Sequence, residues 1–409
     1  MTTLDYGAAL QRLLSSPTLP KLGLTRMRAL MQALGDPQLR YPVLHIAGTK
    51  GKGSTAAMSS SMLRAAGLRV GMTTSPHLLS ARERIVIDGV LVDEAVFCAV
   101  EERVHQAALS IERSLDVPSF FERLIAMSLC AFADAGVDVA VVEVGLGGRL
   151  DATNIVRPAA TAITRLGIDH KDFLGDTLEA IATEKAGIIK AGAPALTISQ
   201  PVEAMEALNQ AGAAAGVDVV VVPVDPRLRP ALFGAHQVEN ASLAVALVRA
   251  GGFDVDDAAV SAGLASVVWP GRYERVGERV ILDGAHNAES ARALRLALDS
   301  DERLKGLARH FVIGMSGGHD VAAFVDALVP GSASIVATRA QQPRALPAAD
   351  IAHAASRHAI VDVVEDVAAA VEIAQGRGGV VVVTGSLFVV GEARGLFVAM
   401  PRDPARPAY

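Results

Sequence analysis

The residues best suited to chemistry first gather in a glycine-rich turn that directly follows an apolar run at residues 43–47. The turn consists of Gly48, Thr49, Lys50, Gly51, Lys52, Gly53 and Ser54. Its glycines let backbone N–H groups converge on phosphate oxygens without a Cβ in the way. Lys52 adds a positive charge, and Ser54 could complete a Mg²⁺ shell at a helix N-terminus, which itself favours anions. The turn therefore predicts binding of a nucleoside triphosphate with Mg²⁺.

The turn departs from the general phosphate-loop pattern, which has four residues between its first glycine and a contiguous Gly-Lys-Ser/Thr. Here the order is Gly-x-x-Gly-Lys-Gly-Ser. The alternative is an ordinary glycine-rich turn with surface lysines. The apolar strand before the turn and the helical pattern after it favour the phosphate-binding interpretation.

A second polar cluster follows the apolar run at residues 139–144, which contains Glu143. A carboxylate buried without a partner would be costly, so we expect Glu143 to meet a cation at the strand's carboxyl end, with Mg²⁺ the natural choice. A structural glutamate paired with an arginine is the alternative. The next residues read GLGGRLDATN; their glycines permit close approach of a substrate, and Arg149, Asp151 and Asn154 offer polar anchors.

Three further segments offer single candidate groups. Ser75, in Thr-Thr-Ser-Pro-His-Leu, could place an oxygen on the metal held by Ser54, or could belong to a plain surface loop. His170 could ligate a metal with Asp169 orienting its polar partners, although a solvated loop histidine is the alternative. Lys185 lies near the end of an amphipathic helix, where a surface lysine is the simplest interpretation.

The C-terminal part repeats the design of an apolar strand, a polar turn and a helix at residues 280–287. Asp283, His286 and Asn287 could face the nucleotide from across a domain cleft. The turn Thr384-Gly385-Ser386 follows another apolar run and carries a weaker signal of the same kind.

The elements that position these residues are short apolar runs rich in valine and isoleucine, separated by segments of helical period. The runs lie at residues 43–47, 137–144, 159–164, 195–199, 217–224, 280–282, 310–314, 334–338 and 379–384. Such runs indicate parallel strands covered by helices on both faces. The predicted class is α/β with a doubly wound sheet.

The chain of 409 residues is long enough for two domains. Trp269-Pro270-Gly271-Arg272 punctuates two α/β stretches and is a candidate hinge. We place the boundary near residue 275, which gives an N-terminal domain at 1–275 with the phosphate loop and a smaller domain at 276–409.

Composition restricts the class of protein. Hydrophobic residues make up 51%, charged residues 20%, and the net charge is −6, as in a soluble globular protein without a global nucleic-acid footprint. Cys98 and Cys130 are too few for a disulfide framework and lack CxxC spacing, which favours a reducing compartment. No signal peptide or spanning segment is evident. We expect a cytoplasmic protein without membrane or nucleic-acid partners.

Taken together and in order, these motifs resemble the folylpolyglutamate synthase and dihydrofolate synthase branch of the Mur ligase family. They are GTKGKGS, TSPHL, VEVGLGGRLDATN, IDHKDFLG, EKAGI, PGR and DGAHN. GLGGRLDATN is the most specific, because it separates the folate enzymes from the cell-wall ligases that share the phosphate loop. The shortened phosphate loop is the form that this family uses.

The resemblance implies Mur ligase architecture, with a phosphate-loop domain followed by a smaller Rossmann-like domain. It also implies an ATP-dependent ligase in which ATP phosphorylates a substrate carboxylate and the amine of L-glutamate attacks the acyl phosphate. The matching positions give Lys52 and the turn to the ATP phosphates. They give Ser54, Ser75 and Glu143 to one Mg²⁺ and Glu143 with His170 to a second, and they make Lys185 a carbamylated lysine that supports the second ion.

The same resemblance assigns Asn240, Arg272, Asp283 and His286 to the nucleotide, with the site assembled by domain closure. Phe121 and Asp151 match pterin-contacting positions, and Arg149 joins them as a folate anchor. The implied partners are ATP, L-glutamate and a folate or dihydropteroate, and we expect a monomer. Residues 314–320, Gly-Met-Ser-Gly-Gly-His-Asp, depart from the family's Gly-Met-x-x-Asp-Lys-Asp at the first aspartate and the lysine. The departure bears on amino-acid selectivity or rate.

The leading hypothesis is a folylpolyglutamate synthase, bifunctional with dihydrofolate synthase activity. One alternative is a cell-wall Mur ligase, which would need a uridine-nucleotide-binding domain before the phosphate loop, where this sequence has 47 residues. The other is a nucleotide-gated binding protein without ligase turnover. Glu143, His170 and Lys185 together speak against that second alternative.

Overall fold

The computed structural model describes residues 5–18, 23–112 and 115–403. Residues 1–4, on which part of the argument against a signal peptide rests, lie outside these ranges. Within the described chain, no helix combines the length and apolar character needed to cross a membrane.

The N-terminal part is built on an eight-stranded sheet in the order β4-β3-β2-β5-β1-β6-β7-β8. The strands from β2 to β8 in that order are parallel, and β3 and β4 add an antiparallel edge. Their bounds are β1 Val43–Ala47, β2 Val70–Thr73, β3 Val86–Ile87, β4 Val90–Leu91, β5 Val139–Glu143, β6 Pro158–Ile163, β7 Ala195–Thr197 and β8 Val219–Val221. The central strands are buried along their whole length, which explains their continuous apolar runs.

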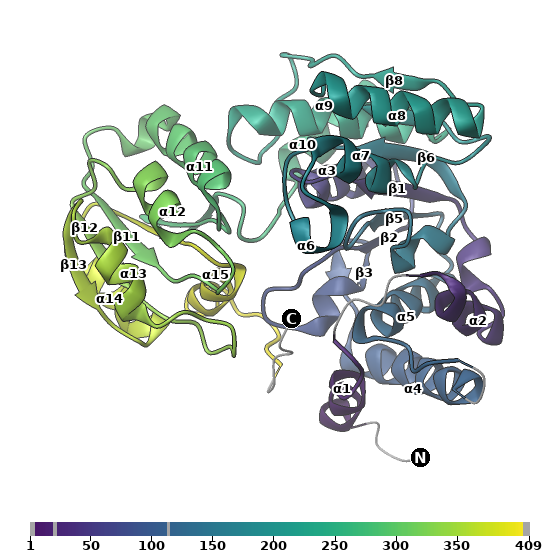
Figure 1. Cartoon of the computed structure of the whole chain (residues 1–409), viewed down its shortest axis with the longest axis horizontal. Coiled ribbons are helices and arrows are strands. Elements are labelled where there is room, and N and C mark those ends of the chain that lie inside the picture. The colour runs from purple at the N-terminus through teal and green to yellow at the C-terminus, as the bar shows by residue number, and fades with distance from the viewer. Residues whose placement is uncertain (1–4, 19–22, 113–114, 404–409) are drawn as a thin grey trace.

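Helices cover both faces of this sheet (Figure 1). One face carries α3 Lys52–Ala65, α9 Ala235–Ala250 and α10 Asp257–Ser266. The other carries α1 Tyr6–Leu14, α2 Thr25–Ala33, α4 Glu94–Ile111, α5 Phe120–Ala135, α7 Leu178–Ala186 and α8 Val202–Ala215. The remaining elements are η1 Pro37–Leu39, η2 Ala81–Arg84, η3 Ala152–Ile155 and α6 Lys171–Leu174. The predicted doubly wound sheet is confirmed.

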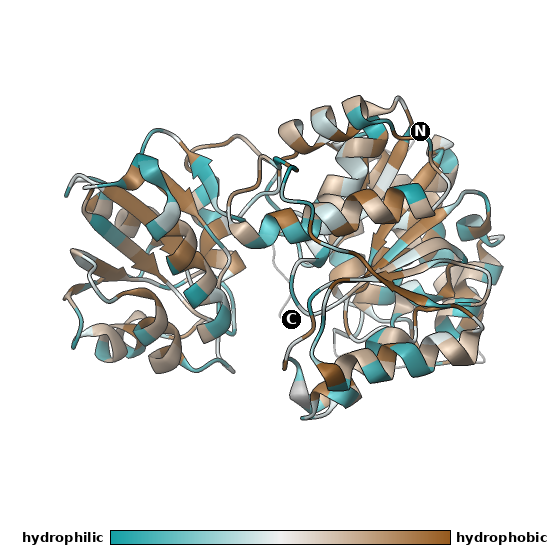
Figure 2. Ribbon diagram, turned by 90° about the horizontal axis from the view of Figure 1, so that it is seen from above, coloured by the Kyte–Doolittle hydropathy of each residue, from teal (hydrophilic) through white to brown (hydrophobic). Residues whose placement is uncertain are grey.

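Alternation along β1 separates the two faces. Leu44 and Ile46 pack in the core beneath α3, α9 and α10, whereas Val43 packs with α2 and α5 on the opposite side. Because neighbouring side chains of a strand point to opposite faces, His45 shares the face of Val43. In Figure 2 the strands are coloured mostly as hydrophobic, and the hydrophilic residues lie mainly in helices and loops.

The C-terminal part has its own six-stranded sheet in the order β13-β12-β11-β14-β10-β9, parallel except for β9. The strands are β9 Glu274–Val276, β10 Val280–Leu282, β11 Arg309–Ile313, β12 Ser334–Ala337, β13 Ile360–Val363 and β14 Val380–Thr384. The helices are α11 Ala288–Ser300, η4 Glu302–Leu304, α12 Val321–Leu328, α13 Ala348–Ala355, α14 Val367–Gln375 and α15 Leu387–Arg394. The helices α11, α12 and α13 pack on one face of this sheet, and α14 and α15 pack on the other.

Several strands escaped the sequence analysis. In β2, Gly71 interrupts the apolar pattern because Phe132 occupies the space of a side chain, with ring atoms 2.6 Å from where a Cβ would lie. The strands β3, β4, β9 and β13, at or next to a sheet edge, are short or partly exposed and lack a continuous apolar run. The predicted domain boundary near residue 275 falls within β9, Glu274–Val276. The boundary stays a prediction.

The two sheets are joined by more than the hinge segment. Phe233, which precedes α9, stacks on Tyr273 with ring centroids 4.6 Å apart. Near the C-terminus, Asp403 accepts hydrogen bonds from Tyr6 (2.6 Å), Ser80 Oγ (2.8 Å) and Ala81 N (2.7 Å). The chain thus returns to the N-terminal part after completing the second sheet (Figure 1).

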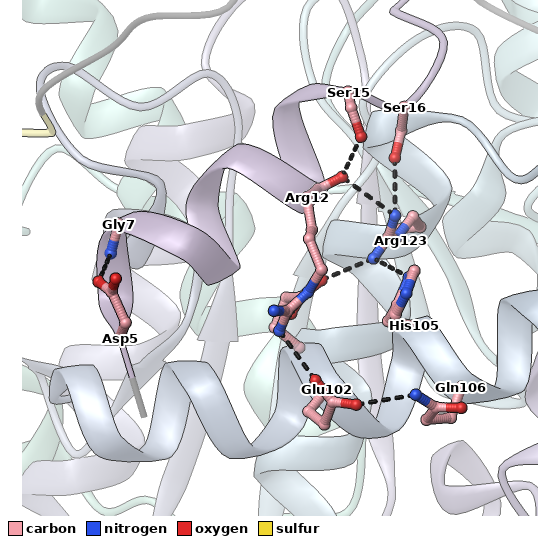
Figure 3. A network of polar contacts seen from close by, with 10 residues as sticks. Asp5, Gly7, Arg12, Ser15, Ser16, Glu102, His105, Gln106 and Arg123 are labelled. Atoms are coloured by element: carbon pink, nitrogen blue, oxygen red, sulfur yellow. Dashed lines mark hydrogen bonds and ion pairs between the residues drawn. The ribbon is translucent and has the colours of Figure 1, made fainter. Parts of the chain in front are cut away.

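A buried ion-pair network fastens α1 to α4 and α5 (Figure 3). Glu101 is fully buried and accepts hydrogen bonds from Arg12 (2.5 Å) and Arg123 (2.7 Å). Arg123 also donates to Ser16 Oγ at 2.9 Å. Because both carboxylate oxygens are paired, this buried charge is compensated and serves the structure.

Candidate active site

The phosphate loop lies between β1 and α3, and its glycines are required by close contacts. Gly48 and Gly51 have φ values of 145° and 91°, which other residues rarely adopt. A Cβ on Gly48 would collide with Thr164 Oγ1, and one on Gly51 would collide with Asn240 Oδ1. The predicted turn is therefore present, and Asn240 of α9 lies directly against it.

Part of the loop is braced by the segment after β6. Thr49 N and Lys50 N donate to Arg165 O at 2.9 and 3.0 Å, and Thr49 Oγ1 donates to Gly167 O at 3.1 Å. Lys52 begins α3 and Ser54 is buried in its first turn. First-turn N–H groups have no partner within a helix. The first-turn N–H groups of α3 are therefore free to donate to a phosphate bound beside the loop.

Glu143 ends β5, and β1 pairs with β5 so that Ile46 is opposite Glu143. Its carboxylate is buried and accepts a hydrogen bond from Ser75 N at 3.1 Å. Burial raises the pKa of Glu143, while the positive charges of Lys52 and Arg272 oppose the rise. The parallel strands β2, β5 and β1 thus bring Ser75, Glu143 and the phosphate loop to one edge of the sheet.

Lys185 is buried, with 4% of its surface exposed, so the interpretation as a surface lysine is wrong. Burial lowers its pKa from 10.5 to about 7, and the positive charge of Lys52 adds to this effect. Gly148 packs against the end of α7, because a Cβ there would lie 2.8 Å from Glu184 O and 2.9 Å from Lys185 O. Because the pKa of Lys185 lies near 7, a substantial fraction of its side-chain amine is neutral near pH 7.

His170 lies in an exposed turn after β6, residues 167–170, which we call the histidine loop. Its φ is 52°, a left-handed conformation, and its N–H donates to Asp169 Oδ1 at 3.0 Å. Although the residue is exposed, partial desolvation of its ring, together with the charges of Lys52, Lys185 and Lys50, lowers the pKa of His170, against the effect of Asp169. Lys50 Nζ lies 3.9 Å from Asp169 Oδ2. The predicted ligand His170 thus lies in the same electrostatic environment as the phosphate-loop lysines and Lys185.

Residues 145–151, here called the GLGGR loop, are held by their own polar groups. Asp151 accepts hydrogen bonds from Leu146 N (2.9 Å), Thr153 N (3.0 Å) and Thr153 Oγ1 (2.5 Å). Asn154 Nδ2 donates to Arg149 O at 2.9 Å and to Gly187 O at 3.0 Å. Asp151 and Asn154 therefore fix the loop's backbone.

The three predicted folate contacts all lie at this loop. The ring of Phe121 lies against Gly145, where it fills the space of a side chain. The guanidinium of Arg149 pairs with Glu184 at 2.6 Å, and Asp151 is occupied as described. Their contact with a folate stays a prediction.

The residues predicted from the C-terminal part follow the carboxyl end of β10. Asp283 accepts hydrogen bonds from Tyr273 N (2.8 Å) and Ala285 N (2.9 Å), and burial raises its pKa against the charge of Arg272. The ring of His286 bonds Gly284 O through Nδ1 at 3.0 Å, and burial lowers its pKa to about 4. Arg272 acts electrostatically on both Asp283 and Glu143, so it connects the two domains' polar groups.

Charged groups of the second domain also face the phosphate loop. Lys50 interacts electrostatically with Glu289, and Asp169 with His286. Residues 314–320, whose sequence differs from the family pattern, include His319, whose ring centroid lies 5.1 Å from that of His286. Gly317 N donates to Arg344 O at 2.8 Å, which holds this segment to its own domain. The two sets of predicted site residues therefore face one another.

Comparisons with known proteins agree with this geometry. The family model described as Mur ligase middle domain matches residues 46–226, and the one described as dihydrofolate synthetase, C-terminal domain, matches residues 272–396. The dihydrofolate synthase/folylpolyglutamate synthase of Mycobacterium tuberculosis is 37% identical, covering 93% of this chain and 90% of that protein. The enzyme of the same name from Bacillus subtilis is 33% identical over 91% and 94% of the two chains.

This chain belongs to the dihydrofolate synthase/folylpolyglutamate synthase family. Solved structures agree: M. tuberculosis folylpolyglutamate synthase complexed with ADP has a TM-score of 0.88 and 36% identity over 97% of this chain and 100% of that one. FolC of E. coli in complex with DHPP and ADP has a TM-score of 0.85 and 30% identity over 96% and 97%. Like other members of this Mur ligase branch, the chain is an ATP-dependent ligase, and the predicted fold and family are confirmed.

Several residues of this family member that shape the site were not found from the sequence. The indole of Trp269 lies over Gly53, 2.7 Å from where a Cβ would be, although the sequence showed only a hinge there. Thr164 fills the space above Gly48. His45 and Thr153 are bonded beneath the GLGGR loop at 2.9 Å. A histidine within an apolar strand is the one signal that could have pointed to this last pair.

The donor set at the sheet edge fits the divalent ion that this ligase family uses. The part of the chain that the structure describes contains no group of three or more His, Cys, Asp or Glu able to hold a metal. The buried carboxylate of Glu143 lies next to the Ser75 segment, and Glu143 forms no ion pair with any of the described residues. Carboxylate and hydroxyl oxygens suit Mg²⁺, which usually completes its shell with water and substrate phosphates.

Proposed function

We propose that this ligase adds L-glutamate to a folate through an acyl phosphate, and that it also accepts dihydropteroate. The observation that carries the proposal is the convergence of the phosphate loop, Glu143 and Lys185 at one sheet edge, beside the GLGGR loop. The proposed dual acceptor is supported by relatives named for both activities, which align over nearly their whole lengths.

The reaction would proceed in two steps. An oxygen of the acceptor carboxylate attacks the γ-phosphorus of ATP, the bond to the bridging oxygen breaks, and ADP leaves. The glutamate nitrogen then attacks the acyl carbon, inorganic phosphate leaves, and the nitrogen loses a proton to solvent. Lys52, the phosphate-loop N–H groups and the helix N-terminus would hold the negative charge that moves between these groups. Mg²⁺, when bound, would neutralise phosphate charge.

The proposal includes two ions and a carbamylated lysine. Ser54, Ser75 and Glu143 would hold the first ion; Glu143 and His170 would hold the second, with Lys185 behind it. Carbamylation forms a bond between Lys185 Nζ and the carbon of CO₂ and releases a proton, so it needs a neutral amine. The lowered pKa of Lys185 supports this step. The lysine charges around His170 favour an anion in their midst.

Domain closure would complete the site. Asn240, Arg272, Asp283 and His286 would hold the nucleotide between the domain at 1–275 and the domain at 276–409. Phe121, Arg149 and Asp151 would face the pterin and its linker. Closing over the acyl phosphate excludes water and aligns the reacting atoms.

The site is built within one chain, so the proposal needs no partner subunit and we propose a monomer. Cys98 and Cys130 are both unpaired and buried. Their free thiols support a reducing compartment, for which we propose the cytoplasm.

The test is phosphate release with Mg·ATP and L-glutamate in the presence of 7,8-dihydropteroate, tetrahydrofolate or no acceptor, with products identified by mass. Glutamate addition to both acceptors is the expected result, and addition to tetrahydrofolate alone would remove the dihydrofolate synthase activity. Lys52→Ala should abolish turnover while thermal unfolding stays unchanged. Absence of acceptor-dependent release in the wild type would instead favour a nucleotide-gated binding protein.

A further inference from the structure

A fully buried histidine lies in the central strand and takes no part in the chemistry described above. His45 is the third residue of β1 and has no exposed surface. Burial, with the nearby charge of Lys190, lowers its pKa to about 3. The ring is therefore neutral, and a neutral imidazole carries one N–H donor and one acceptor nitrogen.

The direction of its hydrogen bond is fixed by the neighbouring groups. Thr153 Oγ1 donates its only proton to Asp151 Oδ1 at 2.5 Å. The contact of 2.9 Å between His45 Nε2 and Thr153 Oγ1 must then run from the histidine to the threonine. His45 is thus the Nε2–H tautomer, and its Nδ1 is buried with no hydrogen-bond partner among the described residues. Leaving one ring nitrogen unpaired costs free energy, so a compensating role for this histidine is expected.

The chain of hydrogen bonds ends in the GLGGR loop. Asp151, oriented by Thr153, accepts from Leu146 N at 2.9 Å and so closes the loop. From the other side, Lys190 Nζ donates to Asn154 O (2.8 Å) and Val156 O (2.7 Å), at the end of the short helix η3 that carries Thr153. His45 therefore anchors from below the turn that sets the loop's shape.

The position of His45 on the sheet separates it from the nucleotide. It points to the face of β1 opposite to α3, the helix that carries Lys52 and Ser54. On its own face lie η3, the loop and α5, which supplies Phe121 against Gly145. A change at His45 should be felt on the loop side of the sheet rather than at the phosphates.

We infer that His45 is a positioning residue for the acceptor: acting through Thr153 and Asp151, it holds the GLGGR loop in the shape that receives the folate or dihydropteroate. The inference rests on the proposed function, because it takes this loop as part of the acceptor site. It assigns no proton transfer to His45, whose role is to donate one hydrogen bond.

The experiment compares His45→Leu, which removes the donor, with His45→Gln, whose amide can donate from nearly the position of Nε2. We expect the KM for tetrahydrofolate to rise about tenfold in His45→Leu and to stay within about twofold of wild type in His45→Gln. The KM for ATP and kcat should change less than about twofold in both. An unchanged acceptor KM in the leucine variant, equal rises for ATP and acceptor, or no recovery with glutamine would each overturn the inference.

A second pair keeps the test decisive if His45→Leu does not fold, as judged by thermal unfolding. Thr153→Ser keeps the relaying hydroxyl and Thr153→Val replaces it with a methyl group of the same shape. The valine variant should raise the acceptor KM as His45→Leu does, and the serine variant should not; equal values for the two would overturn the inference. Wild-type protein without acceptor-dependent turnover would overturn the proposed function itself, a result distinguishable from an unchanged KM in active variants.

Discussion

The GLGGR loop and the histidine loop follow β5 and β6, the two strands that flank β1, but they are held in different ways. The first is closed by the buried side chains of Asp151 and Asn154, which bond its own backbone and the end of α7. In the second, Ile168 and His170 are exposed, and His170 has left-handed backbone geometry. Charges of three lysines surround His170. One loop is built before any substrate arrives, whereas the other is placed where ligand charge can act on it.

The difference suggests a division of labour in this ligase. A prebuilt loop suits recognition of an acceptor of fixed shape, because little conformational entropy is lost on binding. An exposed loop rich in charge suits groups whose charge changes during the reaction. Variants that change the chemistry of the histidine loop, and variants that change the stability of the GLGGR loop, can test this division.

The largest effect is expected at Lys185, where the two loops meet. Lys185→Ala should lower kcat about a thousandfold, because it removes the group proposed to become a carbamate in the charged site. A short carboxylic acid such as acetate should restore part of the activity by supplying a carboxylate. The measurement is kcat with increasing acetate.

Lys190 provides a matched control, since it is a half-buried lysine whose pKa is also lowered by burial, to about 8. It bonds backbone carbonyls instead of facing the phosphate-loop charges. Acetate should not restore Lys190→Ala. Restoration of both variants, or of neither, would contradict the carbamate role of Lys185.

The next largest effect is expected in the histidine loop. His170→Asn keeps a residue type that tolerates left-handed geometry but removes the imidazole, so kcat should fall about a hundredfold. The Mg²⁺ concentration needed for half-maximal rate should rise. Because the side chain is exposed, the melting temperature should change by less than about 1 °C. A large loss of stability with little loss of activity would show that the two loops are not different in kind.

Much of this site could be predicted from the sequence because parallel strands bring their carboxyl ends to one edge. Once β1 and β5 were recognised as apolar runs, the phosphate loop and Glu143 were expected at the same edge of the sheet; their closeness follows from the pairing of β1 with β5. Asp283 and His286 followed from the same design in β10. Local pattern was sufficient, because each polar turn directly follows its strand.

What could not be predicted depends on packing between distant segments. At Lys185 the local pattern indicated a surface lysine, and only the family resemblance pointed to the site; its burial depends on the packing of α7 beside the GLGGR loop. Trp269 was assigned to a hinge, yet its ring covers Gly53. The bond between His45 and Thr153 depends on β1 lying beside β6, whose preceding turn is η3. No local periodicity encodes such contacts.

A smaller effect should appear in the pH profile. The pKa of Lys185 is about 7, so the neutral amine that reacts with CO₂ rises about tenfold in population between pH 6 and pH 8. Activity at limiting bicarbonate should rise with pH over this window, and saturating bicarbonate should flatten the profile. Desolvation and the neighbouring lysine charges lower the pKa of His170, so any step from its titration is shifted toward the acid side of this window. A profile that falls with rising pH, or ignores bicarbonate, would contradict this assignment.

The smallest effect is expected from loosening the GLGGR loop without touching the charged groups. Asn154→Ala leaves the carbonyls of Arg149 and Gly187 without their amide donor, at a cost of about 2 kcal/mol. The melting temperature should then fall by roughly 2–4 °C, and the acceptor KM should rise by a few fold while kcat and the KM for ATP hold. Gln106→Ala, which removes an exposed amide bonded to Glu102 at 2.8 Å, serves as the control and should shift neither. If Asn154→Ala melts like Gln106→Ala, the loop does not depend on its own hydrogen bonds, and the contrast with the histidine loop fails.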